Sequence, residues 1–198
     1  MADVTWFRTP ADDDPGTLNA CYNALDLHVI RGSADEVALT VAEGPRTFAH
    51  LLTDVAACAG VLRAFGVGVG DDVALGRLPG PTAVVGALAV ARVGGVAAYD
   101  DPAGATVRLH ATEAGVVFGV DGEDLPWDVA MRAGRTDPAG CADVPGDAVL
   151  ARHGADTLSV LAALGASDDH DLSAPPGLTL AEVGGLTFWW SDAPEASS

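Results

Sequence analysis

Apolar residues recur at spacings of three and four between residues 18 and 29, a pattern that predicts a helix with one buried stripe. The stripe consists of Leu18, Cys21, Tyr22, Leu25 and Val29. Thr17 is the expected N-cap, and Arg31 and Gly32 supply a basic last turn and the glycine that follows it. The apolar run Val37–Val41 then predicts a short, buried strand.

Helices and strands are expected to alternate in the next part of the chain. Residues 45–65 predict a helix with Thr47 as its N-cap, Gly66 after its end, and His50 off its apolar stripe, on the surface. Strands are expected at residues 73–75, 95–99 and 116–120, and further helices at residues 83–93 and 107–114. Such alternation predicts a three-layer α/β fold, with a mostly parallel sheet and helices on both faces.

The two ends and the last third of the chain have weaker patterns of apolar residues. We expect residues 1–16 to form an N-terminal arm and an acidic loop, and residues 191–198 a flexible tail. Between them the chain is expected to form a single domain that extends to residue 190. The last third predicts a helix at residues 126–132, a loop at 136–145, an extended segment at 147–154, a helix at 155–164 and a strand at 186–190.

The charge balance narrows the classes of function. The 198 residues carry 28 acidic and 10 basic side chains, a net charge of −18, and every basic residue is an arginine. Nucleic acids and anionic membranes select for clusters of Lys and Arg, so we expect neither as a partner. No run of 18 or more apolar residues occurs and residues 1–3 lack a basic side chain, so we expect neither a membrane-spanning segment nor a signal peptide. Cys21, Cys58 and Cys141 are far apart, which favours free thiols in the cytoplasm.

Three segments carry a family resemblance: LNACYNALDLH at residues 18–28, GVGVGDDVALG at 66–76 and RLPGPTAVVGALAVARVGGV at 77–96. They resemble the N-terminal subdomain of AMP-forming acyl-CoA synthetases such as acetyl- and propionyl-CoA synthetase. The resemblance continues more loosely to Gly122 and implies a truncated, degenerate copy of that subdomain. The glycines of the second segment lie between a helix and a strand, the reverse of a dinucleotide fingerprint, which favours a tight turn.

The resemblance implies the fold of the family without its catalysis. Adenylation in this family needs a phosphate loop, a magnesium ligand, an aspartate for ribose and a lysine on a C-terminal domain. The chain has no lysine and ends before most of these parts, so we expect no catalytic residue, no metal and no cofactor. In place of the phosphate loop stand Arg152, His153 and Gly154. They would bind a small anion at the N-terminus of the expected helix, or be solvated or paired with nearby aspartates.

Acidic and aromatic clusters complete the candidates. Asp100 and Asp101 replace the glycine turn that contributes to CoA binding in the family, where they would repel phosphates and are expected to cap a loop. The acidic runs at residues 12–14 and 167–171 suggest cation sites by composition, although solvated turns are the more common use of such runs. Three aromatic residues are consecutive near the end of the chain: Phe188, Trp189 and Trp190. We expect them either to line a pocket or an interface, or to form a final strand that closes the core.

These features favour a non-catalytic binding, regulatory or assembly module. In the family this subdomain packs against a second, similar one, so its loss would leave an apolar face open for a homodimer or another protein partner. Two alternatives remain: one half of a split acyl-CoA synthetase completed by a partner chain, and a module that binds a small molecule or acyl-CoA.

Overall fold

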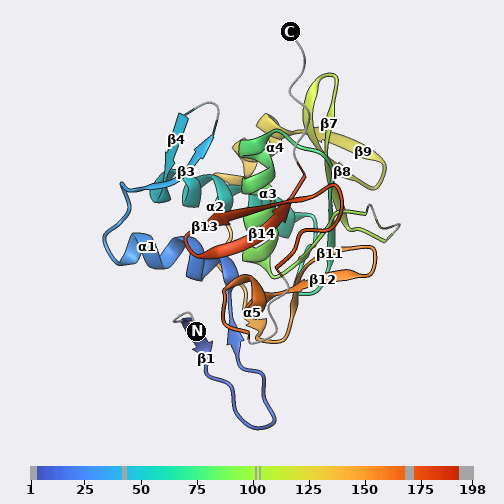
Figure 1. Cartoon of the computed structure of the whole chain (residues 1–198). Coiled ribbons are helices and arrows are strands. Elements are labelled where there is room, and N and C mark those ends of the chain that lie inside the picture. The colour runs from blue at the N-terminus through green and yellow to red at the C-terminus, as the bar shows by residue number, and fades with distance from the viewer. Residues whose placement is uncertain (1–3, 42–43, 101, 103, 168–171, 192–198) are drawn as a thin grey trace.

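The computed structural model describes residues 4–41, 44–100, 102, 104–167 and 172–191. Its centre is a seven-stranded sheet with the strand order β12-β11-β6-β5-β7-β8-β9 (Figure 1). These strands are β5 (Asp72–Leu75), β6 (Val96–Ala98), β7 (Val107–Thr112), β8 (Gly115–Val120), β9 (Glu123–Pro126), β11 (Val149–His153) and β12 (Asp156–Ser159). The four inner strands β11, β6, β5 and β7 run parallel, and the outer strands pair antiparallel. The predicted α/β class with a mostly parallel sheet is confirmed.

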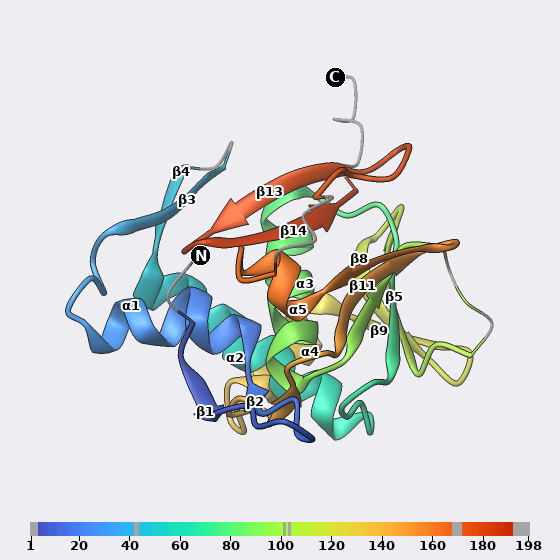
Figure 2. The same cartoon turned by 60° about the horizontal axis from the view of Figure 1, so that its bottom comes forward.

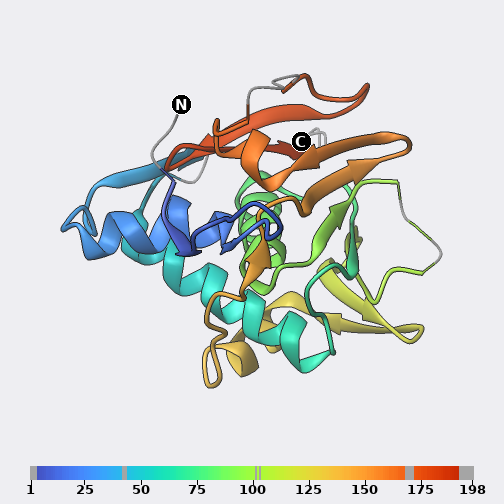
Figure 3. The same cartoon turned by 90° about the horizontal axis from the view of Figure 1, so that it is seen from below.

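The helices α3 (Gly80–Val93) and α4 (Trp127–Gly134) pack against one face of this sheet. Leu75, Leu109 and Phe118 are neighbours on that face, and the Phe118 ring stacks on Trp127 of α4 with centroids 5.2 Å apart. We expected helices on both faces. The helices that the structure describes against this sheet, α3 and α4, lie on one side of it (Figure 3): α3 connects β5 to β6 and α4 lies between β9 and β11, whereas β6 reaches β7 through a loop. The opposite face carries small and polar side chains, among them Ala74 and Arg108.

The helix α2 (Phe48–Ala64) packs on α3 and α4 and follows the predicted pattern. The Thr47 side chain caps it by accepting a hydrogen bond from the His50 amide, and His50 itself is exposed, as predicted. The helix α3 begins with a proline in its first turn and ends at Gly94, which has the left-handed backbone (φ 78°) that glycine adopts without strain. Both helices were predicted within a few residues.

The first helix differs from the prediction at its start. Thr17 lies in the strand β2 (Thr17–Leu18), and the cap is Asn19, whose side-chain oxygen accepts a hydrogen bond from the Tyr22 amide (3.1 Å). The helix then contains a π-helical turn (Tyr22–Asp26) before α1 (Leu27–Ile30). Asn19 is fully buried, and its amide donates to the carbonyls of Ala91, Arg92 and Ala142. A buried side chain with this many partners holds the helix start in place, which a spacing argument cannot reveal. The helix ends at Gly32 (φ 97°) as expected.

The strand β3 (Val37–Val41) occurs where it was predicted but is not buried. It pairs antiparallel with β4 (Gly44–Thr47) as a hairpin separate from the central sheet. Val37 is 56% exposed because the hairpin packs on α2 with one face only. The apolar run was therefore a poor indicator of burial here.

Two predicted helices are wrong. Residues 107–114 form β7 and the turn after it, with Val107 and Leu109 buried and Arg108 and His110 partly exposed, which is the period of a strand. Residues 155–164 form the strand β12 and the four-residue helix α5 (Val160–Ala163). Gly154 adopts a left-handed backbone (φ 60°), so β11 turns back into an antiparallel β12 instead of leading into a helix.

The remaining strands form two small sheets. The strand β1 (Trp6–Arg8) and β10 (Val144–Pro145) flank β2, so the N-terminal arm pairs with the loop predicted at residues 136–145. The strands β13 (Thr179–Val183) and β14 (Leu186–Trp190) form a hairpin that lies against α3 (Figure 2). None of the helices in the described part of the chain has the length and apolar character needed to traverse a bilayer.

Candidate functional site

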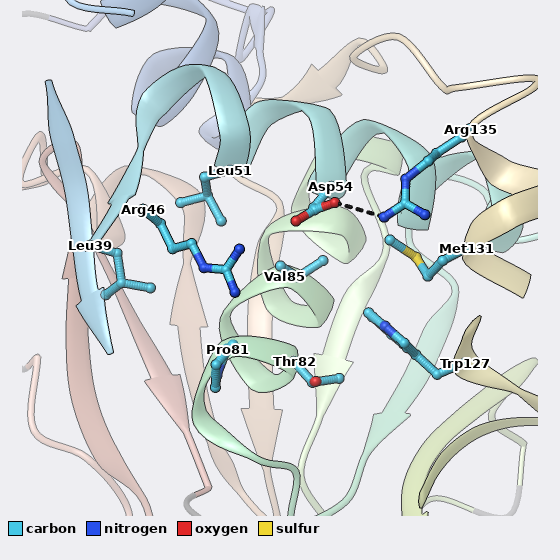
Figure 4. A pocket seen from close by; sticks show the side chains of 10 residues that line it. All are labelled: Leu39, Arg46, Leu51, Asp54, Pro81, Thr82, Val85, Trp127, Met131 and Arg135. Atoms are coloured by element: carbon cyan, nitrogen blue, oxygen red, sulfur yellow. Dashed lines mark hydrogen bonds and ion pairs between the residues drawn. The ribbon is translucent and has the colours of Figure 1, made fainter. Parts of the chain in front are cut away.

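A pocket of about 180 Å³ lies between the β3–β4 hairpin and the helices α2, α3 and α4 (Figure 4). Its apolar wall is contributed by all of these elements, and three of its side chains are charged. The lining residues are Leu39, Arg46, Leu51, Asp54, Pro81, Thr82, Val85, Trp127, Met131 and Arg135.

Arg46 enters the pocket from the hairpin. It pairs with Leu39 in the β3–β4 register, so both side chains lie on the same face of the hairpin, and both point into the pocket (Figure 4). Thr47, the next residue, caps α2, which fixes the point at which β4 meets the helix. The Arg46 side chain is half-buried, and no hydrogen bond or ion pair joins it to any residue that the structure describes.

The far side of the pocket holds an ion pair. Asp54 of α2 accepts a hydrogen bond from Arg135, which follows α4, at 3.1 Å. These two charges neutralise each other, so the pocket as a whole carries one positive charge, that of Arg46. The stacking of Trp127 on Phe118 and the burial of Leu51 and Met131 give the apolar wall a defined shape.

The structure gives Arg152, His153 and Gly154 a different setting from the one expected. Arg152 donates from Nε to Asp72 Oδ1 (2.8 Å) and from Nη2 to Asp72 Oδ2 (2.6 Å). The Gly154 amide donates to Asp100 Oδ2 (3.0 Å). No helix begins at this point, so the helix N-terminus on which the anion site depended is absent from this described segment. The alternative, pairing with nearby aspartates, is what the geometry shows, and Asp100 caps the loop as expected.

The aromatic cluster at the end of β14 lies inside the fold and lines no part of the pocket. Phe188 and Trp189 are almost fully buried, and the Tyr99 hydroxyl donates a hydrogen bond to the Trp189 carbonyl. The Trp190 ring lies over Gly80 at the start of α3. This packing matches the alternative of a final strand that closes the core.

The acidic runs offer little support for a metal site. Asp14 pairs with Arg8 and caps the Gly16 amide (2.9 Å), so it acts in a turn. His170 and the residues around it, at positions 168–171, lie outside the described residues. In the described part of the chain, no three His, Cys, Asp or Glu side chains are placed to hold a metal ion together.

Part of the sequence is similar to known acetyl-coenzyme A synthetases. The chain is 41% identical over 92 residues to acetyl-coenzyme A synthetase of Rhodopirellula baltica, a match that covers 41% of this chain and 14% of that protein. Acetyl-coenzyme A synthetase 2 of Zygosaccharomyces bailii is 40% identical over 100 residues, which are 48% of this chain and 14% of that protein. No protein-family model matches the sequence.

Solved structures agree with these sequence matches. An acyl-CoA synthetase from Brucella canis superposes with a TM-score of 0.57 at 20% identity, over 75% of this chain and 34% of that one. MatB from Rhodopseudomonas palustris superposes with a TM-score of 0.53 at 19% identity, over 75% of this chain and 36% of that one. The chain resembles a part of the AMP-forming acyl-CoA synthetases. The resemblance inferred from the sequence is therefore confirmed, and the acyl-CoA synthetase-like fold with it.

Sequence reasoning missed the pocket of this acyl-CoA synthetase-like chain altogether. Arg46, Asp54 and Arg135 are separated along the sequence and belong to no motif, and they meet only because the hairpin and α4 pack on α2. The one available signal was an arginine directly before the N-cap Thr47. A single arginine outside any motif has little specificity as a signal for a site.

Proposed function

We propose that this acyl-CoA synthetase-like chain acts as a non-catalytic binding or assembly module. The observation that carries the proposal is the antiparallel turn from β11 through Gly154 into β12. In our interpretation of the sequence, this segment corresponds to the family's phosphate loop. A triphosphate is normally held by backbone amides between a strand and a helix, with a lysine beside them.

The charges around this segment support the same proposal. The Arg152 guanidinium already binds Asp72, and the Gly154 amide donates its hydrogen bond to Asp100. Both carboxylates would repel a triphosphate. The 198 residues contain no lysine that could replace the missing cation. Since the matched segment covers only 14% of the acetyl-CoA synthetases compared here, the activity of those proteins does not transfer to this chain.

We also propose that the module assembles with a second copy or a partner protein. The mean hydropathy of the whole sequence is positive (+0.27) despite the net charge of −18, which fits a chain with an apolar interface to cover. Several large apolar side chains are exposed, among them Ile30 at 67% and Val37 at 56%. Light scattering at micromolar concentration is expected to give the mass of a dimer, and a monomeric mass in the purified chain would contradict self-association.

The test of the main proposal is ATP–pyrophosphate exchange by the purified chain with acetate or propionate. We expect no exchange above that of a protein-free blank, with an active acetyl-CoA synthetase as the positive control. Exchange by the chain alone would overturn the proposal.

A second candidate function is one half of a split synthetase. The identity of 41% over 92 residues favours it, because a scaffold retained at this level can still dock a complementary chain. In that case, a chain that supplies the phosphate loop and a lysine-bearing domain would restore exchange when mixed with this one, and the mixture would lose it when either chain is omitted.

A further inference from the structure

Arg46 is a charged group that is half-buried in the pocket without a partner among the described residues. Other guanidinium groups nearby have one: Arg135 binds Asp54 at 3.1 Å, and Arg63 of α2 binds Asp137 at 3.0 Å. A guanidinium that is partly removed from water and left unpaired loses hydration without gaining hydrogen bonds. An anion in the pocket would supply them, and a head group that presents two oxygens side by side, as a carboxylate or a sulfonate does, fits the forked guanidinium best.

The rest of the pocket is suited to an apolar group. The side chains of Leu39, Leu51, Val85, Met131 and Trp127 surround the space into which Arg46 points (Figure 4). The volume of about 180 Å³ is close to that of an apolar cavity of about 150 Å³ that holds benzene in another protein. One ring, or a branched chain of similar size, would fill it and displace water from both walls.

The net charge of the pocket limits how many negative charges the ligand's head group can carry. Arg46 and Arg135 contribute two positive charges and Asp54 one negative charge, which leaves a single positive charge. A phosphate monoester carries nearly two negative charges at neutral pH. It would leave one of these charges uncompensated beside Asp54, on a protein whose net charge is −18. A head group with one negative charge is therefore favoured over a phosphate, and polyphosphate ligands such as ATP and CoA are disfavoured.

We propose that this pocket binds a small organic monoanion, a carboxylate or sulfonate attached to an apolar body about the size of a benzene ring. The proposal rests on the binding function proposed above and gives that function a ligand class. Arg46 binds the head group, and the walls contributed by α2, α3 and α4 enclose the apolar body.

The test uses four probes that share a benzene ring and differ in the head group: benzoate, benzenesulfonate, phenyl phosphate and benzamide. Each is titrated into the full chain by calorimetry at low ionic strength, with saturation-transfer NMR for weak binding. We expect saturable binding of benzoate and benzenesulfonate, and weaker binding of phenyl phosphate and benzamide. A charge-assisted pair of this kind corresponds to roughly a 10- to 100-fold change in Kd.

Variants of two arginines locate the site. Arg46→Met keeps much of the side-chain volume and removes the charge, and it is expected to weaken benzoate binding roughly tenfold or more. Arg46→Lys is expected to retain part of the affinity, because the charge remains but the two-pronged geometry is lost. Arg31→Met is the matched control: Arg31 is exposed, lies outside the pocket and changes the net charge equally, so its Kd is expected to equal that of the wild type.

Three results would overturn the proposal. They are no binding of any probe with a Kd of roughly 10 mM or lower, equal affinity for benzamide and benzoate, or equal loss of affinity in Arg46→Met and Arg31→Met. Circular dichroism of each variant shows whether it is folded. If Arg46→Met is unfolded, the benzoate affinity of Arg46→Lys is compared with that of Arg31→Met instead. Failure of the non-catalytic function would instead appear as pyrophosphate exchange, which these titrations do not measure.

Discussion

Arg92 and Asp26 form a two-pronged ion pair in the interior, from Nη1 to Oδ2 at 2.8 Å and from Nη2 to Oδ1 at 3.2 Å. Arg92 belongs to α3 and Asp26 to the π-helical turn of the first helix. The Arg92 Nε also donates to the Ala139 carbonyl at 2.7 Å. Their side chains are only 8% and 17% exposed, so this pair joins three distant segments of the chain inside the fold.

Removing one partner of this pair is expected to destabilise the fold strongly. Asp26→Ala would leave a buried guanidinium without its carboxylate, a change that costs about 3–5 kcal/mol in comparable sites. The free energy of unfolding, measured in urea, gives the loss directly. The control is Asp128→Ala, which breaks the exposed pair with Arg132 and is expected to change that free energy by about 0.5 kcal/mol or less. Equal losses in both variants would contradict a structural role for the buried pair.

The three thiols are expected to react in a defined order. Cys58 is fully buried, Cys21 is buried beside Arg92 (3.7 Å from Nη1), and Cys141 is partly exposed. A hydrogen bond with Cys21 and burial raise the pKa of Cys141, so even this thiol should react more slowly than a free cysteine. Iodoacetamide at pH 8, followed by peptide mass spectrometry, should label Cys141 first. Labelling of Cys58 at the same rate in the folded chain would contradict this order.

Stability is expected to fall at alkaline pH. Burial raises the pKa of the Cys58 thiol above its usual 9.0 and that of the Tyr99 phenol above its usual 10.0. Both groups stay protonated in the folded chain while the unfolded chain releases its protons, so their contribution to stability is complete below pH 9 and decreases as the pH rises. Urea unfolding between pH 7 and pH 11 should show this decrease.

The variant Tyr99→Phe distinguishes the contribution of Tyr99 to this loss of stability from that of Cys58. It should reduce the loss above pH 10 while the loss above pH 9 from Cys58 remains. At pH 7 it should cost about 1 kcal/mol, because the Trp189 carbonyl loses the hydrogen bond that the Tyr99 hydroxyl donates. An unchanged pH profile in Tyr99→Phe would contradict the burial of the phenol.

Close packing of α2 on α4 depends on glycine. A Cβ at Gly134 would lie 2.1 Å from the Ala57 carbonyl oxygen, so Gly134→Ala must push the helices apart. We expect a loss of about 1–3 kcal/mol in the free energy of unfolding. Gly140→Ala is the control, since no atom lies within 4 Å of its added Cβ, and it should be close to neutral. Comparable melting temperatures for the two variants would argue against the close helix contact.

Local signals were sufficient for the elements that carry the scaffold. The cap Thr47, the apolar face of α2 and the proline at the start of α3 are all local features, and the structure places both helices within a few residues of the prediction. The resemblance to acyl-CoA synthetases also depended on contiguous residues, such as those around Asn19. These residues turn out to form the buried cap of the first helix.

The failures share a physical cause. Residues 107–114 and 155–164 contain apolar residues that suit a helix or a strand, and pairing with other strands decided the outcome: β7 pairs with the distant β5, and β12 pairs with the preceding β11. The pocket around Arg46 is likewise a product of packing among the β3–β4 hairpin, α2, α3 and α4. Spacing and motifs within a short stretch of sequence predict neither the strand pairing nor the pocket.

A calorimetric titration of MgATP into the full chain, with acetate present and the products analysed for acyl-adenylate, tests directly whether this chain is non-catalytic. We predict no saturable heat at millimolar nucleotide and no adenylate, because Asp72 already binds the Arg152 guanidinium and Asp100 accepts the hydrogen bond of the Gly154 amide. Saturable binding of MgATP together with formation of acetyl-adenylate by the pure chain would contradict it.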